Sequence, residues 1–443
     1  METSTKSRIA ISFYETQLVR SQLTNENREI LNQLRNHSGL IIFTNADNRD
    51  LISRLVAEHQ IENCEIIAFK PPNFNSLCQF IVFLLRWSEP SSGTYRLAYR
   101  EFIAGRISRF GLIARLSLWR LLSRFSSYKR ILRKVILYLH AWSTKGSDFE
   151  VLPNIDLLVL TSITNLDDDI PLGIWYKNQG CVVVGSVRSW DNLVTKGGVA
   201  LEPDLFLANS EYIRECAIRN QSFNHKNIEL VPSSYFQDHL KPFYPTRQSP
   251  NIAYACLGPS LNPDEMNLIK LLERLSRILN IHLTVVQHPQ FPHILNQETF
   301  LHLNFVTFSY SEASLQDFYN EVSKFSLVLG GGTTFLLDAA FLDIPIYAIN
   351  YEVESQEFWK SSLRAFDVLP HTKAFFKRCQ VPIIENERAL FDLLVAALSG
   401  FKLKEIDKDP LEYFVGSSHM RFAERFSDVI QRNVTTKSFF SQK

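Results

Sequence analysis

The stretch "FSLVLGGGTTFLLDAAFLDIPIYAINY", residues 325–351, decides the fold class of this chain. An apolar run ends in three glycines, two threonines follow, and a helix-length segment carrying Asp338 leads to a second apolar run after Pro345. Continuous apolar strands that alternate with helices are typical of a parallel sheet covered on both faces. The stretch therefore predicts a strand–helix–strand unit of an α/β fold.

The same alternation extends along most of the chain. Expected strands cover residues 39–45, 64–69, 155–163, 181–187, 204–210 and 228–233, then 252–257, 282–287, 304–308, 326–331, 344–350 and 380–384. Three prolines in residues 236–251 indicate a linker between the two series, and the residues before 10 and after 434 are expected to be frayed. We therefore expect two Rossmann-like domains, residues 1–240 and 241–443, that face a cleft.

Composition limits the class of protein. The 443 residues carry a formal net charge of +1 and are 45% hydrophobic, as in ordinary soluble proteins. The six cysteines are scattered without a CxxC pair, which argues against a zinc site or a disulfide framework and fits a reducing compartment. The polar start "METSTKSRIA" has no apolar signal segment, and no apolar run approaches the roughly 20 residues of a membrane span. We therefore expect a cytoplasmic protein without a bound metal.

Residues 95–142 are strongly basic and are expected to form a helical insertion in the first domain. They contain eleven Lys or Arg and one acid, Glu101, so the segment carries +10 and the rest of the chain −9. One helical face collects four arginines: Arg106, Arg109, Arg120 and Arg124. Basic helices with aromatic residues lie on anionic lipid surfaces, so we favour a membrane-surface contact over a purely structural helix. Nucleic acid is the least favoured partner, because no recognised binding motif is present.

The glycine-rich turn in the quoted stretch is a candidate phosphate site. Its residues Gly331, Gly332, Thr333 and Thr334 stand between an expected strand and an expected helix. Glycines allow the backbone to approach a ligand closely, and unpaired N–H groups at a helix start attract anions. The alternative is a tight turn in which Thr333 is an ordinary N-cap. His288, just past another strand, is expected at the same sheet edge, either as a hydrogen-bond donor to phosphate or as a surface histidine.

A second candidate site follows the strand at 181–187, in "GSVRSWDNLVTKGG", residues 185–198. The reactive groups of this loop are Arg188, Ser189, Trp190, Asp191, Asn192 and Lys196. Asp191 can act as a general base on a hydroxyl, the two cations can balance phosphate charge, and the indole can pack against a sugar ring. In the alternative interpretation, Asp191 and Asn192 form a turn and Trp190 belongs to the core. Asp47, after the strand at 39–45, is the rival base.

The acidic stretch "LDDDIPLG", residues 166–173, resembles a metal site at first sight. Asp169 before Ile170 and Pro171 instead fits a helix N-cap with proline near the first turn. Asp167 and Asp168 then lie at the positive end of that helix. We therefore expect a capping role for these acids.

Five stretches in this order resemble bacterial surface-polysaccharide glycosyltransferases of the GT-B fold. They are residues 185–198, "PDLFLANSEYIRECA" at 203–217, "IELVPSSYF" at 228–236, the His-Pro pair at 288–289, and residues 325–351. The related enzymes include capsule polymerases, CMP-sugar transferases with a His-Pro motif, and teichoic-acid glycerophosphate transferases. The resemblance covers roughly residues 155–400.

The resemblance implies a nucleotide-activated sugar as a substrate, bound by the second domain, and no cofactor. Carried over, Thr333 and Thr334 hold the donor phosphate, His288 contacts it, and Asp338 lies near the ribose or base. The implied reaction is an inverting, metal-independent transfer to an envelope glycan or lipid-linked acceptor, at the inner face of the cell membrane. The alternatives are a polyol-phosphate transferase of the same fold and a non-catalytic protein that binds sugar nucleotides or glycans.

Overall fold

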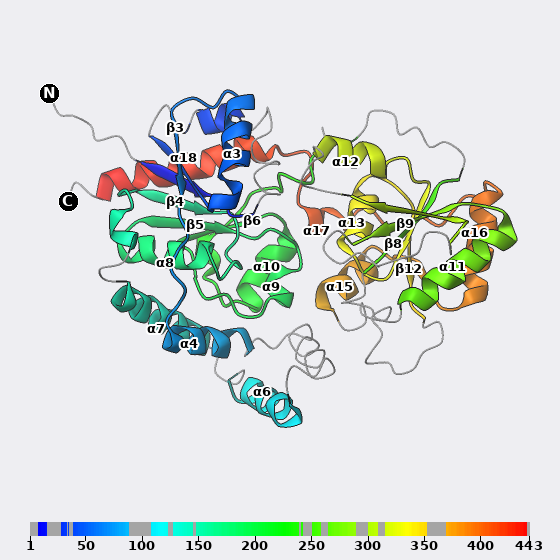
Figure 1. The fold of residues 1–443 in the computed structure, drawn as a ribbon, viewed down its shortest axis with the longest axis horizontal. Helices are drawn as coiled ribbons and strands as arrows, with labels where there is room; N and C mark the ends of the chain where they lie inside the picture. The colour runs from blue at the N-terminus through cyan, green and yellow to red at the C-terminus, as the bar shows by residue number, and fades with distance from the viewer. Residues whose placement is uncertain are drawn as a thin grey trace. The chain divides into compact units, whose positions relative to one another are not determined.

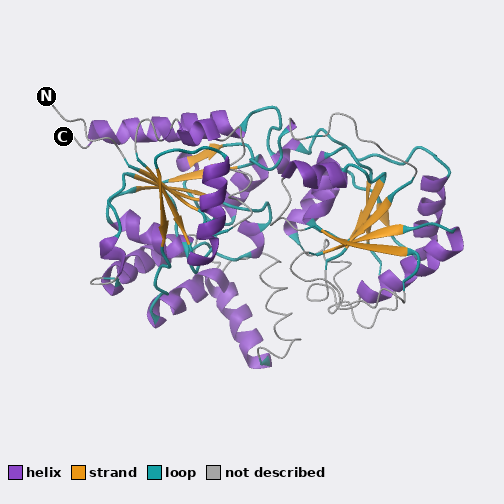
Figure 2. Ribbon diagram, turned by 45° about the horizontal axis from the view of Figure 1, so that its top comes forward, coloured by secondary structure: helices purple, strands orange, loops and turns teal. Residues whose placement is uncertain are grey.

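The computed structural model describes residues 8–15, 28–32, 34, 39–87, 108–122, 127–144, 148–238, 241, 250–257, 265–288, 300–308, 315–351 and 369–440. The chain divides into two units. The first comprises the residues up to Ala98, Ile107–Gln237 and Tyr413 onward, and the second comprises Tyr99–Arg106 and Asp238–Glu412. Figure 2 shows a sheet flanked by helices in each unit.

The first unit is built on a seven-stranded sheet in the order β3-β2-β1-β4-β5-β6-β7. Every neighbouring pair in it is parallel. The strands are β1 (Ile9–Ser12), β2 (Leu40–Thr44), β3 (Cys64–Ala68), β4 (Leu157–Leu160), β5 (Val182–Ser186), β6 (Leu205–Ala208) and β7 (Ile228–Leu230). The middle strands are fully buried and mostly apolar, as a parallel sheet covered on both faces requires.

Helices cover both faces of this sheet (Figure 1). The described helices of this unit, not all of which touch the sheet, are α3 (Ala46–Glu58), α4 (Ser76–Trp87), α6 (Arg109–Leu122), α7 (Tyr128–Ser143), α8 (Asp169–Asn178), α9 (Asn192–Thr195), α10 (Glu211–Arg219), α17 (Glu412–Val415) and α18 (Phe422–Phe440). On one face, Ile9 and Ile11 of β1 pack with Ile52 of α3 and with Val429 of α18. On the other face, Phe43 of β2 contacts Tyr176 of α8, with ring centroids 5.8 Å apart.

The C-terminal helix α18 belongs to the first unit, which corrects the expected domain division. The sequence-based division placed all residues from 241 to 443 in the second domain. The structure instead packs Phe426 and Ile430 into the core of the first sheet. Arg425 adds polar contacts, because its Nη2 lies 3.0 Å from Glu229 Oε2 and its Nε donates to the Leu230 carbonyl at 3.2 Å. An amphipathic helix is placed by the apolar surface available to it, and chain position does not reveal which unit supplies that surface.

The second unit repeats the same plan with a six-stranded parallel sheet in the order β10-β9-β8-β11-β12-β13. Its strands are β8 (Ile252–Ala255), β9 (Leu283–Gln287), β10 (Leu303–Thr307), β11 (Leu327–Gly330), β12 (Ile346–Ile349) and β13 (Ile383–Ile384). Its helices are α11 (Glu265–Leu279), α12 (Leu315–Val322), α13 (Thr334–Phe341), α15 (Pro370–Arg378) and α16 (Glu387–Leu398). Leucines of α11 and α16 pack with the sheet in one core.

The expected fold class is confirmed, because both sheets are parallel and doubly wound and the described part of the basic segment forms helices α6 and α7 of the first unit. Twelve strands lie within or beside the expected ranges. The sequence-based interpretation missed β1, which begins at Ile9 in a region expected to be frayed. Most of the expected linker at 236–251 lies outside the described residues.

Gly416, beside α17, provides a test of how the C-terminal segment docks on the first unit. Its φ is +83°, and a Cβ added there would lie 2.1 Å from the Asn209 carbonyl oxygen. Gly180 has a similar φ of +76° but open space around an added Cβ. A left-handed backbone costs an alanine about 1–2 kcal/mol, so Gly180→Ala should lower the free energy of unfolding by about that much. Gly416→Ala should lower it clearly more, because its Cβ would also meet the Asn209 carbonyl oxygen. Urea unfolding of both variants checks this, and equal losses would contradict the docking.

Candidate functional site

The polar groups of the first unit gather where the strand order reverses. β1 and β4 are neighbours in the sheet, but the chain after β1 continues to β2 on one side, and β4 begins the other side. Loops leaving the carboxyl ends of such strands diverge, and ligands of open α/β sheets bind in the crevice between them. We call the polar groups there the switch-point cluster. It consists of Ser12, Tyr14, Glu15, Thr161, Ser162, Thr164, Asn165, Asp168, Asp169, Ser186, Arg188 and Asn192.

A fully buried carboxyl, Asp169, lies at the base of this cluster. The Ser12 hydroxyl at the end of β1 donates to Oδ1, and the Asn165 amide donates to Oδ2 at 3.1 Å. Burial is the largest influence on Asp169 and raises its pKa well above the ordinary carboxyl range, against the effect of these hydrogen bonds. Asp169 is the first residue of α8, and its hydrogen bond with Ser12 links this helix to β1. Its raised pKa favours the protonated carboxyl.

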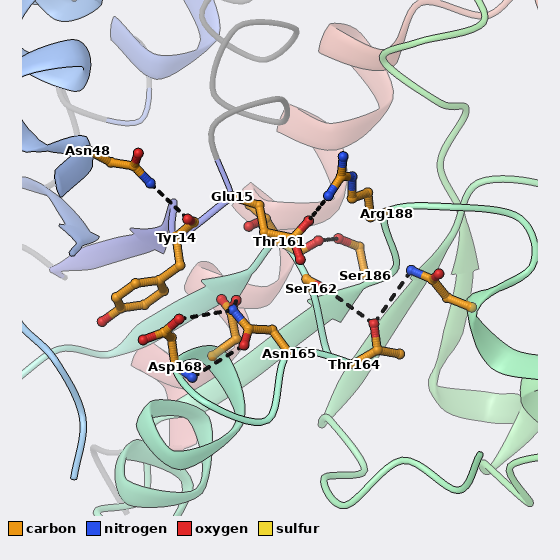
Figure 3. Close-up of polar contacts among 12 residues, drawn as sticks. Tyr14, Glu15, Asn48, Thr161, Ser162, Thr164, Asn165, Asp168, Ser186 and Arg188 are labelled. Atoms are coloured by element: carbon orange, nitrogen blue, oxygen red, sulfur yellow. Dashed lines mark hydrogen bonds and ion pairs between the residues drawn. The ribbon is translucent and has the colours of Figure 1, made fainter. Parts of the chain in front are cut away.

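Asn165 organises the loop between β4 and α8 (Figure 3). Its Oδ1 accepts from the backbone N–H groups of Asp167 and Asp168 at 3.1 and 3.3 Å, and its Nδ2 donates to Asp168 Oδ2 at 3.3 Å. The expected N-cap at Asp169 is therefore one residue out of place. Asp168 occupies the N-cap position without a side-chain cap bond, and Asp169 is the first helical residue. The reason is that the Asn165 side chain satisfies the backbone donors ahead of the helix.

An ion pair joins two loops of the cluster. Arg188, after β5, donates from Nη1 to Glu15 Oε2 at 2.8 Å, and both side chains are half-buried. Figure 3 shows this pair beside Thr161 and Ser186, and the Ser186 hydroxyl donates to the Thr161 carbonyl at 3.1 Å. Glu15 therefore balances the charge of Arg188, which the sequence had suggested as a partner for phosphate.

Several of the remaining residues of the 185–198 loop make contacts that hold the loop in place. Trp190 is only 5% exposed and packs against Tyr212 and Phe414 at centroid distances of 6.2 and 6.0 Å, so the core interpretation describes its ring. Asn192 is buried, with its Nδ2 3.5 Å from Thr164 Oγ1. Ser189 accepts from the Asn192 N–H at 3.1 Å. Lys196 has an exposed side chain, and its carbonyl accepts from Arg86 Nε at 3.1 Å.

The two candidate bases differ in setting. Asp191 precedes α9, and the Thr195 hydroxyl lies 2.9 Å from its Oδ2, so the carboxylate is partly enclosed and oriented. Asp47 is exposed in the first turn of α3. Its neighbour Asn48 donates to the Tyr14 carbonyl at 2.8 Å. Asp191 thus follows β5 and Asp47 follows β2, at the same edge of the first sheet.

The glycine-rich turn occupies the equivalent position in the second unit, where β8 and β11 are neighbours. Gly331 is buried, and Gly332 has a φ of +128°, which an L-residue rarely adopts. Thr333 is at the N-cap position of α13 but makes no side-chain cap bond. Its buried Oγ1 finds no hydrogen-bond partner among the described residues. Thr334, the first residue of α13, is exposed, and Asp338 is buried within the helix.

A second buried carboxylate lies at the edge of the same sheet. Glu265, at the start of α11, is 0% exposed. Its Oε1 accepts from the Tyr254 hydroxyl at 2.8 Å and from the Leu257 N–H at 2.7 Å. His288 follows β9 and is half-buried, and burial lowers its pKa while the charge of Glu265 opposes that effect. The lowered pKa favours a neutral imidazole at pH 7.

Sequence reasoning missed Ser12, Glu15, Asn165 and Glu265. The first two were missed together with β1, because a four-residue strand beside a polar terminus gives a weak pattern. Glu265 had a usable signal, since acids favour the first turn of a helix. The described residues include no group of three or more His, Cys, Asp or Glu arranged to hold a metal ion.

The predicted membrane-surface arginines are described only in part. Arg109 is exposed at the start of α6. Arg106, Arg124 and the side chain of Arg120 lie outside the described residues. No described helix is long and apolar enough to cross a membrane.

No protein-family model matches the chain, and no curated protein matches it significantly. Solved structures do resemble it. S. aureus MnaA with UDP is 9% identical, with a TM-score of 0.50 and 97% of each chain covered. The fold is GT-B-like. Two further neighbours are a Methanocaldococcus jannaschii UDP-GlcNAc 2-epimerase with UDP-GlcNAc and UDP, and a glycosyltransferase from Rickettsia africae ESF-5.

Both further neighbours are 10% identical to the chain. The epimerase has a TM-score of 0.48, with 96% of this chain and 99% of that chain covered. The glycosyltransferase has a TM-score of 0.46, with 97% of this chain and 99% of that chain covered. At such identities, the strand orders and the likeness to the S. aureus protein establish the fold and leave the activity to be argued from the site.

Asp169 provides a pH test of the cluster. Because its folded-state pKa is raised, its contribution to the free energy of unfolding is full below about pH 3.9, the ordinary carboxyl pKa, and is lost as pH rises through the folded pKa. Asp169→Asn does not titrate at this site. The stability of Asp169→Asn relative to wild type should therefore rise between about pH 4.5 and about pH 7.5. Urea unfolding at both pH values measures this difference.

The exposed neighbour provides the control for that experiment. Asp167→Asn makes the same change from acid to amide at an exposed position, so the effect of pH at Asp169 is measured as the difference between the two variants. Parallel stability profiles for Asp169→Asn and wild type would show that burial of Asp169 does not govern its protonation.

Proposed function

We propose that the chain is a glycosyltransferase that moves a sugar from a nucleotide-activated donor to an envelope or capsule glycan or a lipid-linked acceptor. The GT-B-like fold is consistent with a nucleotide-sugar enzyme. The observation that supports the proposal most is Thr333, whose buried hydroxyl oxygen has no partner among the described residues at a helix start. Inversion, metal independence and a cytoplasmic location at the inner membrane face are parts of the proposal that come from the sequence resemblance.

The donor side of the proposal rests on the turn between β11 and α13. Three successive glycines let a phosphate approach the backbone, and the first N–H groups of α13 have no helical partners of their own. Thr333 is at the N-cap position, but its hydroxyl makes no capping hydrogen bond to the backbone of α13. A diphosphate oxygen placed there accepts from both threonine hydroxyls and from the backbone. A neutral His288 can add one N–H at the same sheet edge.

The acceptor side rests on the switch-point cluster and on the loop after β5. The hydroxyls, amides and paired charges of the cluster match the many hydroxyl groups of a sugar. Asp191 is the proposed base because its carboxylate is both oriented by Thr195 and partly accessible. Taking the acceptor proton as the donor bond breaks avoids a charged, protonated oxygen in the product. Ser189, Asn192 and Lys196 belong to the proposed acceptor loop through their positions beside Asp191.

A donor-hydrolysis assay with a panel of nucleotide sugars tests the proposed class. UDP-sugars are the first donors to try, because the structure of the S. aureus neighbour contains UDP. An enzyme should slowly release nucleotide without an acceptor, whereas a binding protein should only be stabilised thermally by UDP, CMP, CDP or GDP. Formation of an epimerised nucleotide sugar without transfer would contradict the proposal, as would stabilisation without any turnover. Activity only with a polyol-phosphate donor would support the alternative transferase.

Replacing both threonines tests the donor site. Thr333→Ala with Thr334→Ala removes two hydroxyl donors, and a hydrogen bond to a charged group contributes about 1.5–3 kcal/mol. Nucleotide binding should weaken at least tenfold in titration calorimetry. The matched control is Thr372→Ala, a buried threonine of α15 in the same unit, which should leave the affinity unchanged. A folded double variant that binds nucleotide normally would refute the site.

Asp191→Asn tests the base while preserving size. Loss of a general base costs about 10²–10⁴-fold in rate, so this variant should fold, bind nucleotide normally and transfer at least a hundredfold more slowly. Asp47→Asn is the matched control, and only one of the two should behave in this way. Near-normal turnover of Asp191→Asn would assign the loop a structural role and move the base to Asp47 or elsewhere. Failure to fold would identify Asp191 as a turn residue.

A further inference from the structure

Helix α7 carries an exposed apolar stripe that the fold does not cover. Ile131, Val135, Tyr138 and Trp142 are 57%, 37%, 74% and 67% exposed. Their spacing of four, three and four residues places them on one side of the helix over three turns. Exposed single apolar residues are common in proteins, but a continuous stripe with two aromatic residues indicates a contact surface.

The opposite side of α7 fixes the direction in which the stripe faces. Lys129, Arg133, Ile136 and His140 are buried there. The Arg133 Nε donates to the Val199 carbonyl at 2.9 Å, and its guanidinium lies 4.9 Å from the Phe223 ring centroid. Lys129 donates to the Asn220 carbonyl, and the His140 ring contacts the Pro171 carbonyl at 3.2 Å. These contacts anchor the inner side of α7 to the unit, so the apolar stripe on its other side faces solvent.

Two neighbouring helices also expose apolar side chains. α4 packs against α7, with Cys78 Sγ 3.9 Å from the Ile136 carbonyl, and α6 contacts α4 (Figure 1). α4 exposes Leu77 and Phe80, each at 55%. α6 exposes Phe110 at 81%, Ile113 at 52% and Leu121 at 55%, at a spacing that again selects one helix side. We call the exposed residues the insertion face: Leu77, Phe80, Phe110, Ile113, Leu121, Ile131, Val135, Tyr138 and Trp142.

The charged residues of the three helices are all cations. Arg130 and Lys134 are exposed one residue before Ile131 and Val135, and Arg109 is exposed beside Phe110. Neither α4 nor α6 nor α7 contains an acidic residue. Long cationic side chains can reach past an apolar surface to the phosphate level of a bilayer, while tyrosine and tryptophan favour the interface itself. An apolar stripe flanked on its own helix by exposed cations therefore complements an anionic lipid surface.

We propose that the insertion face binds the surface of an anionic bilayer, with the α7 stripe immersed at the interface and Arg130 and Lys134 at the lipid phosphates. A second copy of the chain is a poorer occupant, because a two-fold contact through this face brings like charges together. Nucleic acid matches the cations but leaves the aliphatic and aromatic stripe in water. The proposal stands independently of the proposed transferase activity.

Vesicle sedimentation with the full chain tests the proposal. The vesicles are phosphatidylcholine with and without phosphatidylglycerol, at low and high salt. The variants are Tyr138→Ser with Trp142→Ser, and Arg130→Gln with Lys134→Gln. The matched control is Leu301→Ser with Phe401→Ser, two side chains that are 75% and 69% exposed in the second unit. Circular dichroism confirms that each variant is folded, and donor hydrolysis is measured in parallel.

Wild type and the control should sediment with the anionic vesicles, should bind the neutral ones weakly, and should be released by salt because surface charges are screened over about 8 Å at physiological ionic strength. Each insertion-face variant should lose roughly tenfold or more of its partitioning. Equal binding to both vesicle types, unaltered binding of the variants, a wild-type dimer that the same variants dissolve, or RNA binding tighter than vesicle binding would each overturn the proposal. Vesicle binding without donor hydrolysis would count against the transferase alone.

Discussion

Parallel strand pairing is the constraint on which the rest of this structure depends. In both sheets every strand leaves at the same edge, so the chain must return through a helix before the next strand begins. That requirement gathers Ser12, Thr161 and Arg188 at one edge of the first sheet, although about 150 residues or more separate Ser12 from the other two. It places Gly330 and Ala255 at the corresponding edge of the second sheet. The polar loops are thus a consequence of the sheet order, and their side chains decide what each edge can bind.

The two units share a buried carboxyl at a helix start, held by different residues in each. Each buries a carboxyl at the first position of a helix next to the strand reversal, Asp169 in α8 and Glu265 in α11. At Asp169, burial is the largest influence and raises the pKa of the carboxyl. Asp169 is held by the hydroxyl of Ser12 and the amide of Asn165, and Glu265 by a tyrosine hydroxyl and a backbone N–H. These bonds therefore fix a helix to a strand at the reversal point of each sheet.

The strand–helix alternation could be predicted from the sequence because fully buried parallel strands are continuous apolar runs such as "LLVL" in β4. Once the strands were located, the loops at their carboxyl ends could be predicted as candidate sites, because ligands of open α/β sheets bind there. β1 could not be predicted, since four residues give little periodicity. Ser12 and Glu15 were missed because they belong to this strand or follow it closely. The placement of α18 on the first unit depends on packing with Ile9 and Ile42, which lie far away in the sequence. Trp190 belongs to the core because Phe414 covers it, a contact equally distant along the chain.

In the basic segment, the number of charges in the sequence does not reveal which of them are buried and which are exposed. Lys129 and Arg133 are one turn apart and equally cationic in sequence, yet both are buried and bonded to backbone carbonyls. Arg130 and Lys134, each the next residue along, are exposed. A helix advances about 100° per residue, so adjacent cations point to different surroundings. In the same way Arg188, which looks available in sequence, is paired with Glu15 once β1 and β5 lie in one sheet. Burial and partner therefore decide which of the chain's charges face outward to meet another molecule.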